Sequence, residues 1–537
     1  MKKNLAAVLL CGTIASAVLA GCGQSASSAP AEENSAKQGE AAEKDELVFV
    51  NYRDIRDLNP HLYAGEMYAQ SILYDTLVSN TADGYVGCLA EDWSISEDGR
   101  TYTFDIRDGV KFSDGTPCDA NAILANFDAI LENRDRHTWL EMMNLLTDVS
   151  APDSDTLVIE MSEPYYPMLT ELACIRPFAM ISPACMIDGS TKEGVNGYIG
   201  TGPYVLTDFV TDEYAVFERN EHYWGEAPSI RKITVKVIPD NQTRIMALEN
   251  GEIDLIFGKN MLDADAISKY VDSEAYTVGL SEPTSTRHIV LNTTHEILGD
   301  AAVRRALQHA TNREAISQGI FYGLEPAADT LYAATVPYCD ADLKPYVYNM
   351  ETAAKMLDEA GWKLGSDGIR EKDGKKLELD LLYNSDSVTE KTISEYLQSE
   401  YQKLGISMKI HGEEEQSYRD NMKAGNFDMV FNICWGMPYD PQSSLAAMRA
   451  PVYGDYAAQQ GLEDKAEIDQ AITDILTSTD EEERKELYKF VLTRLHEDAV
   501  YIPLTYETNK ALHRTDLNGV QFGADQYDVD FASMYFE

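Results

Sequence analysis

A change in residue type at Glu46 limits what most of this chain can fold into. Residues 22–45 are mainly small or charged and nearly free of large apolar side chains. Such a segment cannot bury enough surface to fold, so we expect a flexible linker. Residues 47–50 then predict a first buried strand, and about 490 residues follow, too many for one hydrophobic core. We therefore predict a body of two or more lobes.

Residues 1–21 have the features of a secretory signal. Lys2 and Lys3 precede an apolar run to Ala20, which is shorter than the about 20 residues that span a membrane. The run ends in Leu-Ala-Gly-Cys, which resembles the lipobox of bacterial lipoproteins, with Cys22 as the lipidated residue. We expect an extracytoplasmic protein held at the cell membrane through this lipid alone. An ordinary cleaved signal followed by a chance cysteine is the alternative.

The charge balance excludes one large class of functions. The formal net charge is -46, from 44 basic and 90 acidic residues. A chain this acidic repels nucleic acid and anionic lipid, so we expect no nucleic-acid partner. The acidic residues are spread along the body, which favours a solvated surface over a dedicated cation trap.

Neither the cysteines nor the histidines form a motif of catalysis or metal binding. The chain contains no C-x-x-C pair, no H-E-x-x-H or H-x-H pattern, no G-x-S-x-G and no P-loop. The six body cysteines have scattered spacing, which favours buried free thiols, although an exported protein could also pair them. They are Cys88, Cys118, Cys174, Cys185, Cys339 and Cys434.

The local patterns predict an α/β protein with mixed sheets. Residues 92–106 alternate on both sides of a Glu-Asp-Gly turn, which predicts a hairpin. A helix is predicted over 119–131, capped near Asp119. Strands and helices then alternate along the chain. Further strands are expected at 233–237, 253–256 and 377–382, and further helices at 243–250, 303–310, 352–360 and 389–404.

Four segments in the body resemble the peptide/nickel family (family 5) of substrate-binding proteins of ABC importers. They match in the same order as in the family and together are specific for it. The segments are Asp108-Gly-Val-Lys-Phe-Ser-Asp-Gly-Thr-Pro117, Gly200-Thr-Gly-Pro-Tyr204, Arg219-Asn-Glu-His-Tyr-Trp-Gly225 and Leu248-Glu-Asn-Gly-Glu-Ile-Asp254.

The resemblance implies the large family 5 form of the two-lobed periplasmic-binding-protein type II fold, which closes on its ligand like a hinge. We expect lobe I at residues 46–284 plus 508–537 and lobe II at 285–507, with crossings near 282–290 and 503–508. It also implies a monomer that does no chemistry and has no tightly bound cofactor. The expected partners are the ABC permease and ATPase subunits.

Within the family, the chain looks most like the nickel-binding branch, which includes binders of metal–metallophore complexes. The segments that carry this likeness are residues 58–63, 133–141, 176–178 and 435–441. The branch's cleft residues, carried over one by one, fall on Tyr63, Met67, Arg136, Trp139, Arg176, Trp435 and Tyr439. The transported ligand would be a nickel chelate or a related transition-metal chelate.

The chemistry of these residue types fits such a ligand. Arg136 and Arg176 would bind the carboxylates of a chelator, because the guanidinium group forms bidentate pairs with them. The aromatic side chains would form apolar walls with polar tips, and Met67 a soft contact. Tyr453 stands where the branch can place a metal-coordinating histidine. Since a phenol is a poor nickel ligand, we expect the protein to supply no direct metal ligand.

Other interpretations of the same residues stay open. Trp139 and Trp435 also suit a hydrophobic core, Arg136 a solvated helix end, and His61 and His137 a structural role. The chief alternative function is a di- or oligopeptide-binding protein of a peptide importer. Peptide-binding relatives tend to carry an acidic residue shortly after the equivalent of Trp435 to hold the peptide amino terminus, whereas here Met437-Pro438 occupies that stretch, with Asp440 nearby. An extracellular hydrolase on the same fold has no nucleophile–base motif to support it.

Overall fold

The computed structural model describes residues 44–537 except 82–83, 260 and 435–439. The predicted signal, Cys22 and nearly all of the predicted linker lie outside the described residues, as do Trp435 and Tyr439. In the described part of the chain, no helix has the length and apolar character needed to cross a bilayer.

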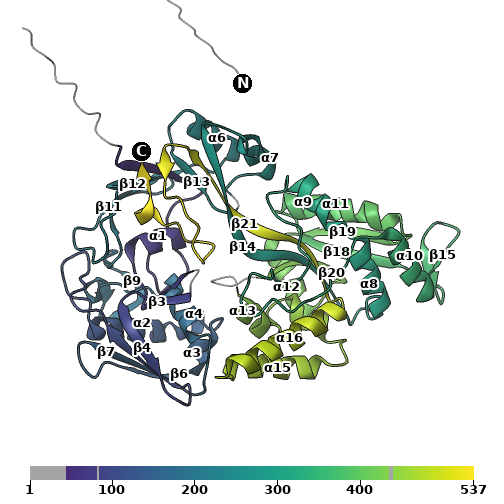
Figure 1. Cartoon of the computed structure of the whole chain (residues 1–537), viewed down its shortest axis with the longest axis horizontal. Helices are drawn as coiled ribbons and strands as arrows, with labels where there is room; N and C mark the ends of the chain where they lie inside the picture. Colours follow the sequence, from purple (N-terminus) through teal and green to yellow (C-terminus); the bar gives the residue numbers. More distant parts are fainter. Residues whose placement is uncertain (1–43, 82–83, 260, 435–439) are drawn as a thin grey trace, which may run out of the picture. The chain divides into compact units, whose positions relative to one another are not determined.

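A mixed sheet of ten strands runs through the body (Figure 1). Pairs β1·β12, β1·β13, β18·β19 and β18·β20 are parallel, whereas β10·β11, β11·β12, β13·β21, β14·β21 and β14·β20 are antiparallel. The predicted mixed α/β class is confirmed. In spatial order the strands are β10 (Tyr204–Val210), β11 (Tyr214–Arg219), β12 (Lys232–Val237), β1 (Glu46–Asn51), β13 (Leu255–Phe257), β21 (Tyr501–Arg514), β14 (Tyr276–Leu291), β20 (Met429–Cys434), β18 (Glu378–Asn384) and β19 (Ser407–Glu413).

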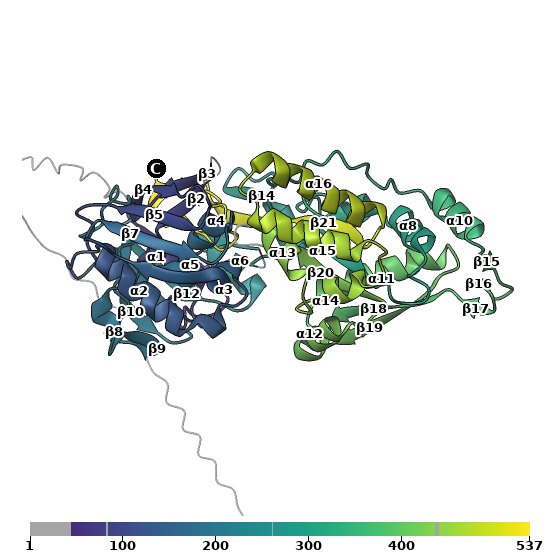
Figure 2. The ribbon, with the colours of Figure 1, turned by 90° about the horizontal axis from the view of Figure 1, so that it is seen from below.

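The two long strands β14 and β21 connect the two halves of this sheet (Figures 1 and 2). Their antiparallel ladder extends from the Tyr276↔Arg514 pair to the Val290↔Tyr501 pair. Its register shifts between Leu280 and Pro283 and again between Pro283 and Ser285. Because proline cannot donate to a ladder, the pairing is weakened where the chain passes from one half to the other.

The N-terminal half carries a second, antiparallel sheet of four strands. Its strands are β4 (Ala90–Ile95), β5 (Thr101–Ile106), β7 (Thr156–Met161) and β6 (Leu146–Ser150). β4 and β5 form the predicted hairpin. Asp119 caps α2, as predicted, by accepting hydrogen bonds from Asn121 N and Ala122 N. The helices of this half are α1 (Met67–Leu73), α2 (Ala120–Glu132), α3 (Glu141–Leu145), α4 (Met168–Leu172), α5 (Ile175–Phe178), α6 (Asn241–Glu249) and α7 (Ala264–Ile267).

The other half is built on the parallel β18–α11–β19 unit and a set of surrounding helices. Apolar side chains of its sheet and helices form one core, which includes Ile289, Leu307 and Leu381. The helices are α8 (Ala301–Ala310), α9 (Arg313–Ile320), α10 (Met350–Glu359), α11 (Val388–Gln402), α12 (Glu415–Ala424), α13 (Pro441–Ala447), α14 (Gly454–Gln459), α15 (Lys465–Thr477) and α16 (Glu481–Glu497).

The two halves also touch away from the crossing strands. The Tyr166 ring, from the N-terminal half, lies edge-on to Tyr338 at 6.2 Å, and Tyr338 stacks on Tyr488 of α16 at 4.8 Å. Backbone joins them too, since Tyr166 N donates to Leu476 O. All six body cysteines are buried free thiols, as the spacing favoured.

Candidate functional site

Three of the predicted site residues gather on the N-terminal half. The guanidinium carbon of Arg176 lies 5.6 Å from the centre of the Tyr63 ring, and the Trp139 ring lies 6.5 Å from the same ring. Tyr63 is 42% exposed, whereas Trp139 is half-buried and packs against the core of the half. A cation over an aromatic face and two aromatic walls thus share one small surface.

Two buried histidines fix the position of Tyr63. His137 Nε2 lies 3.0 Å from His61 O, and its Nδ1 lies 3.3 Å from the Tyr63 hydroxyl. Because a carbonyl oxygen can only accept, Nε2 carries the proton and Nδ1 accepts from the hydroxyl of Tyr63. Burial lowers the pKa of His137 to about 4, so the ring is neutral at physiological pH. His61 and His137 therefore act structurally.

Arg176 supports the same loop while keeping donors free. It is 7% exposed, and it donates to the backbone oxygens of Tyr63 and Gly65 and to Gln70 Oε1 at 3.0 Å. Its Nε is buried and has no hydrogen-bond partner among the described residues. Burial lowers the pKa of the guanidinium. These three acceptors are neutral oxygens, which leave its charge available to an anion.

The other described candidates lie around this group. Arg136 ends the 3-10 turn η1 (Arg134–Arg136) and is exposed. Met67 begins α1 and packs against the core beneath it. Tyr453 belongs to the other half, directly before α14. Burial raises the pKa of Tyr63. Tyr453 raises this pKa further by a smaller electrostatic effect, so its phenol lies within electrostatic reach of Tyr63.

A cavity of about 1190 Å³ is lined by residues of both halves. Its wall on the N-terminal half includes Tyr85, Tyr166 and Thr170, and its wall on the other half includes Tyr338, Asp440, Gln442 and Arg484. Residues 281–284 of β14 and residues 521–524 near the C-terminus complete it. Nearly all of these residues escape prediction from the sequence, because they come from distant segments without a shared local pattern.

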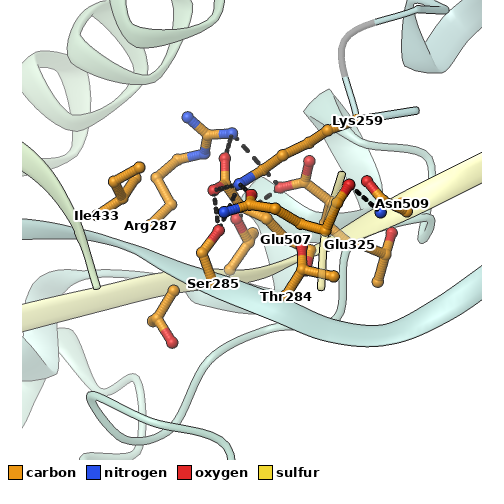
Figure 3. Close-up of polar contacts among 12 residues, drawn as sticks. Lys259, Thr284, Ser285, Arg287, Glu325, Ile433, Glu507 and Asn509 are labelled. Atoms are coloured by element: carbon orange, nitrogen blue, oxygen red, sulfur yellow. Dashed lines mark hydrogen bonds and ion pairs between the residues drawn. The ribbon is translucent and has the colours of Figure 1, made fainter. Parts of the chain in front are cut away.

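A buried ionic cluster lies on the crossing strands (Figure 3). Glu507 of β21 pairs with Arg287 of β14 and with Lys259, and it accepts a hydrogen bond from Ser285. Glu325 pairs with Lys510 at 3.5 Å and lies 3.8 Å from Arg287. Burial alone would raise the pKa of Glu507, but Arg287 and Lys259 hold it well below its usual range.

Comparison with known proteins assigns the chain to a family. Residues 84–455 match the model of bacterial extracellular solute-binding proteins, family 5 Middle. The nickel-binding periplasmic protein of Escherichia coli (strain K12) is 42% identical over 496 residues, which cover 91% of this chain and 94% of that protein. The dipeptide-binding protein of the same organism is 26% identical over 495 residues, and the alignment covers 86% of this chain and 89% of that protein.

A solved structure gives the same result in three dimensions. The crystal structure of NikA from Brucella suis in complex with Fe(III)-EDTA has a TM-score of 0.89 and 44% sequence identity, and it covers 92% of this chain and 100% of that one. The chain belongs to the family 5 bacterial extracellular solute-binding proteins. The predicted family and its fold are thereby confirmed.

Proposed function

We propose that this protein is the extracytoplasmic binding component of an ABC importer and captures a nickel chelate, or the chelate of a related transition metal. One observation carries the proposal: Arg176, Tyr63 and Trp139 form one surface in a chain that is 42% identical to a nickel-binding periplasmic protein. The guanidinium would bind the chelator's carboxylates and the rings would cover its apolar parts. Such a protein is a carrier and not an enzyme.

The metal would arrive with its coordination already filled. Among the described residues, no group of three or more His, Cys, Asp or Glu side chains is arranged to hold a metal ion. Burial raises the pKa of Tyr453, which makes its phenolate, the form that would bind a metal, still scarcer at neutral pH. In this proposal the ligand contacts come from Tyr63, Met67, Arg136, Trp139, Arg176 and Tyr453, together with Trp435 and Tyr439.

The two halves would act as lobes that close on the chelate. We place lobe I at residues 46–284 plus 508–537 and lobe II at 285–507, with the hinge at the irregular part of the β14·β21 ladder. Only the extra contacts made in the closed state favour closure. Tyr453 would reach the chelate from lobe II, opposite Tyr63.

The remaining parts of the proposal concern where the protein works. Residues 1–21 would direct export, and the lipid on Cys22 would hold a monomer at the cell membrane, near the permease and ATPase subunits. Mass spectrometry of the mature protein from cells tests this directly. Diacylglyceryl-modified Cys22 at the new N-terminus is the expected result, and a mature N-terminus elsewhere would contradict it.

Native mass spectrometry tests the ligand class. The purified protein is incubated with Ni²⁺ alone, with Ni²⁺ premixed with histidine, and with a panel of dipeptides and tripeptides. The proposal predicts an adduct with the mass of metal plus chelator. An adduct with peptides alone would instead favour the peptide-import alternative, for which the buried carboxyl of Asp440 at the cavity is the specific observation.

A further inference from the structure

The cavity between the halves is larger than a small metal chelate requires. Its volume of about 1190 Å³ exceeds the roughly 300–1,000 Å³ of ordinary small-molecule pockets. It also lies next to the Tyr63 surface. Thr170 belongs to the cavity wall, and its backbone oxygen accepts a hydrogen bond from Cys174 Sγ at 3.5 Å. Arg176, which lies at the Tyr63 ring, follows Cys174 by two residues. A ligand bound at Tyr63 thus has space beside it.

Three polar atoms of the cavity wall are buried without a hydrogen-bond partner in the described structure. They are Arg484 Nε, Gln442 Nε2 and Asp440 Oδ2. Gln442 is 4% exposed and Asp440 is 8% exposed. Because buried polar groups are almost always hydrogen-bonded, three such atoms around one cavity indicate that a partner is missing there. Two of the three are N–H donors, so the missing partner contains acceptors.

Arg484 is placed to bind an anion. Its Nη1 donates to Ser478 O at 2.9 Å, and its Nη2 donates to the Tyr338 hydroxyl at 3.4 Å. Its guanidinium carbon lies 4.5 Å from the centre of the Tyr166 ring and 6.0 Å from that of Tyr338. These contacts fix the plane of the group but neutralise none of its charge. A guanidinium group has five N–H donors, so three remain for a carboxylate.

The other charges around the cavity permit an anion near Arg484. Arg484 is the one cationic side chain among the described residues that line the cavity. Glu97, Glu282 and Asp530 also line it, but all three are exposed, so solvent and salt screen them. Asp440 is buried, and burial raises its pKa to about 7. A carboxyl that holds a proton for much of the neutral range repels an anion less and can donate to it.

We propose that the cavity holds a carboxylate-bearing organic arm of the transported chelate, bound by Arg484 and Gln442. This inference rests on the proposed function and specifies its ligand. The chelator is long enough to reach from the Tyr63 surface into the cavity, and it carries a carboxylate at its far end. The tyrosine rings of the cavity pack against the arm, and the planar guanidinium group of Arg484 binds the carboxylate at the end of the arm.

Titration calorimetry with two chelates tests this inference on the purified full chain. One titrant is Ni²⁺ premixed with histidine, and the other is Ni²⁺ premixed with histidine whose amino nitrogen carries an alkyl arm ending in a carboxylate. The wild type binds the long chelate more tightly. Arg484→Gln weakens the long chelate by about tenfold or more and the histidine chelate by less than about twofold. Arg484→Lys recovers only part of the lost affinity, because an ammonium group cannot bind a carboxylate in bidentate fashion.

Lys489→Gln is the matched control, since it removes the same charge from an exposed position of α16 outside the cavity. It leaves both affinities unchanged, and urea midpoints of all variants verify folding. An equal loss for both chelates in Arg484→Gln, or no loss for the long one, overturns the inference while the proposed function stands. A wild type that binds neither chelate overturns the proposed function and this inference with it.

Discussion

Lys259 Nζ lies 2.6 Å from a carboxylate oxygen of Glu507, which joins the segment after β13 to the crossing strand β21. Arg287, on the other crossing strand, pairs with the same carboxylate. Glu507 is 4% exposed, so this ionic cluster has almost no access to water. A buried pair is costly to break, because the partner charges are then left unsatisfied.

Replacing Glu507 should therefore destabilise the whole protein. Glu507→Gln leaves Lys259 and Arg287 without their shared anion, and we expect the free energy of unfolding to fall by about 3–5 kcal/mol. Urea denaturation measures it. Glu282→Gln is the control, because Glu282 lies on the other crossing strand, β14, but is exposed, and it should change stability by less than about 0.5 kcal/mol. Equal effects of the two variants would show that the cluster adds no stability.

The two buried histidines should make the protein less stable in mild acid. Burial lowers the pKa of His61 to about 3 and that of His137 to about 4, whereas an unfolded histidine titrates near about 6.5. Between pH 6.5 and pH 4 the unfolded state binds protons that the folded state does not. The stability should therefore fall as the pH drops, by up to about 1.4 kcal/mol per pH unit for each histidine.

Urea midpoints at a series of pH values from 7 to 4.5 measure this dependence. His137→Gln should flatten the curve, since glutamine can donate to His61 O without taking up a proton. His411→Gln serves as control, because this histidine is 53% exposed in its side chain and lies on the surface beside Asp380 and Glu413. A variant at His137 with the full wild-type slope would show that its ring is already charged in the folded protein.

Arg176 should contribute both to the loop structure and to the ligand. Arg176→Ala removes the hydrogen bonds to Gly65 and Gln70 and the charge at the Tyr63 ring. We expect affinity for the metal chelate to fall by about 2–5 kcal/mol and the free energy of unfolding to fall by about 1–3 kcal/mol. Calorimetry and urea denaturation of the same sample separate the two effects. Unchanged affinity would remove Arg176 from the site.

Tyr453 provides a test of direct metal coordination. Tyr453→Phe should alter chelate affinity by less than about 0.5 kcal/mol, since the hydroxyl is not a metal ligand in this account. Tyr453→His should add affinity for Ni²⁺ supplied without a chelator, because imidazole is a good nickel ligand. Equilibrium dialysis with the nickel chelate measures Tyr453→Phe, and dialysis with bare Ni²⁺ measures Tyr453→His. A large loss in the phenylalanine variant would show that the phenol binds the metal.

Local patterns in the sequence predicted most of the individual elements. The strand at 47–50, the hairpin at 92–106 and the helix capped by Asp119 all occur, because alternation, turn residues and side-chain capping act over a few residues. The order of strands in the large sheet could not be predicted in this way. The pairing of β14 with β21 joins residues more than two hundred positions apart, and only packing of the whole body selects it.

The site was predictable only as far as the family resemblance extended. It pointed to Tyr63, Trp139 and Arg176, which the structure brings together. It did not predict that His137 would hold the Tyr63 hydroxyl, because a lone buried histidine has no sequence pattern. Gln442 and Arg484 were missed for a related reason. Their position at the cavity depends on how α13 and α16 pack, and the sequences of these helices contain no pattern that predicts it.

The most direct test of the account is titration calorimetry of the purified protein with Ni²⁺ alone, Ni²⁺ premixed with excess chelator, and a small peptide panel. The account predicts binding heat with the premixed metal chelate and none with bare Ni²⁺ or with peptides. Binding heat with peptides alone would contradict it and place the protein among the peptide carriers. Tight binding of bare Ni²⁺ would contradict the claim that the chelator fills the coordination of the metal.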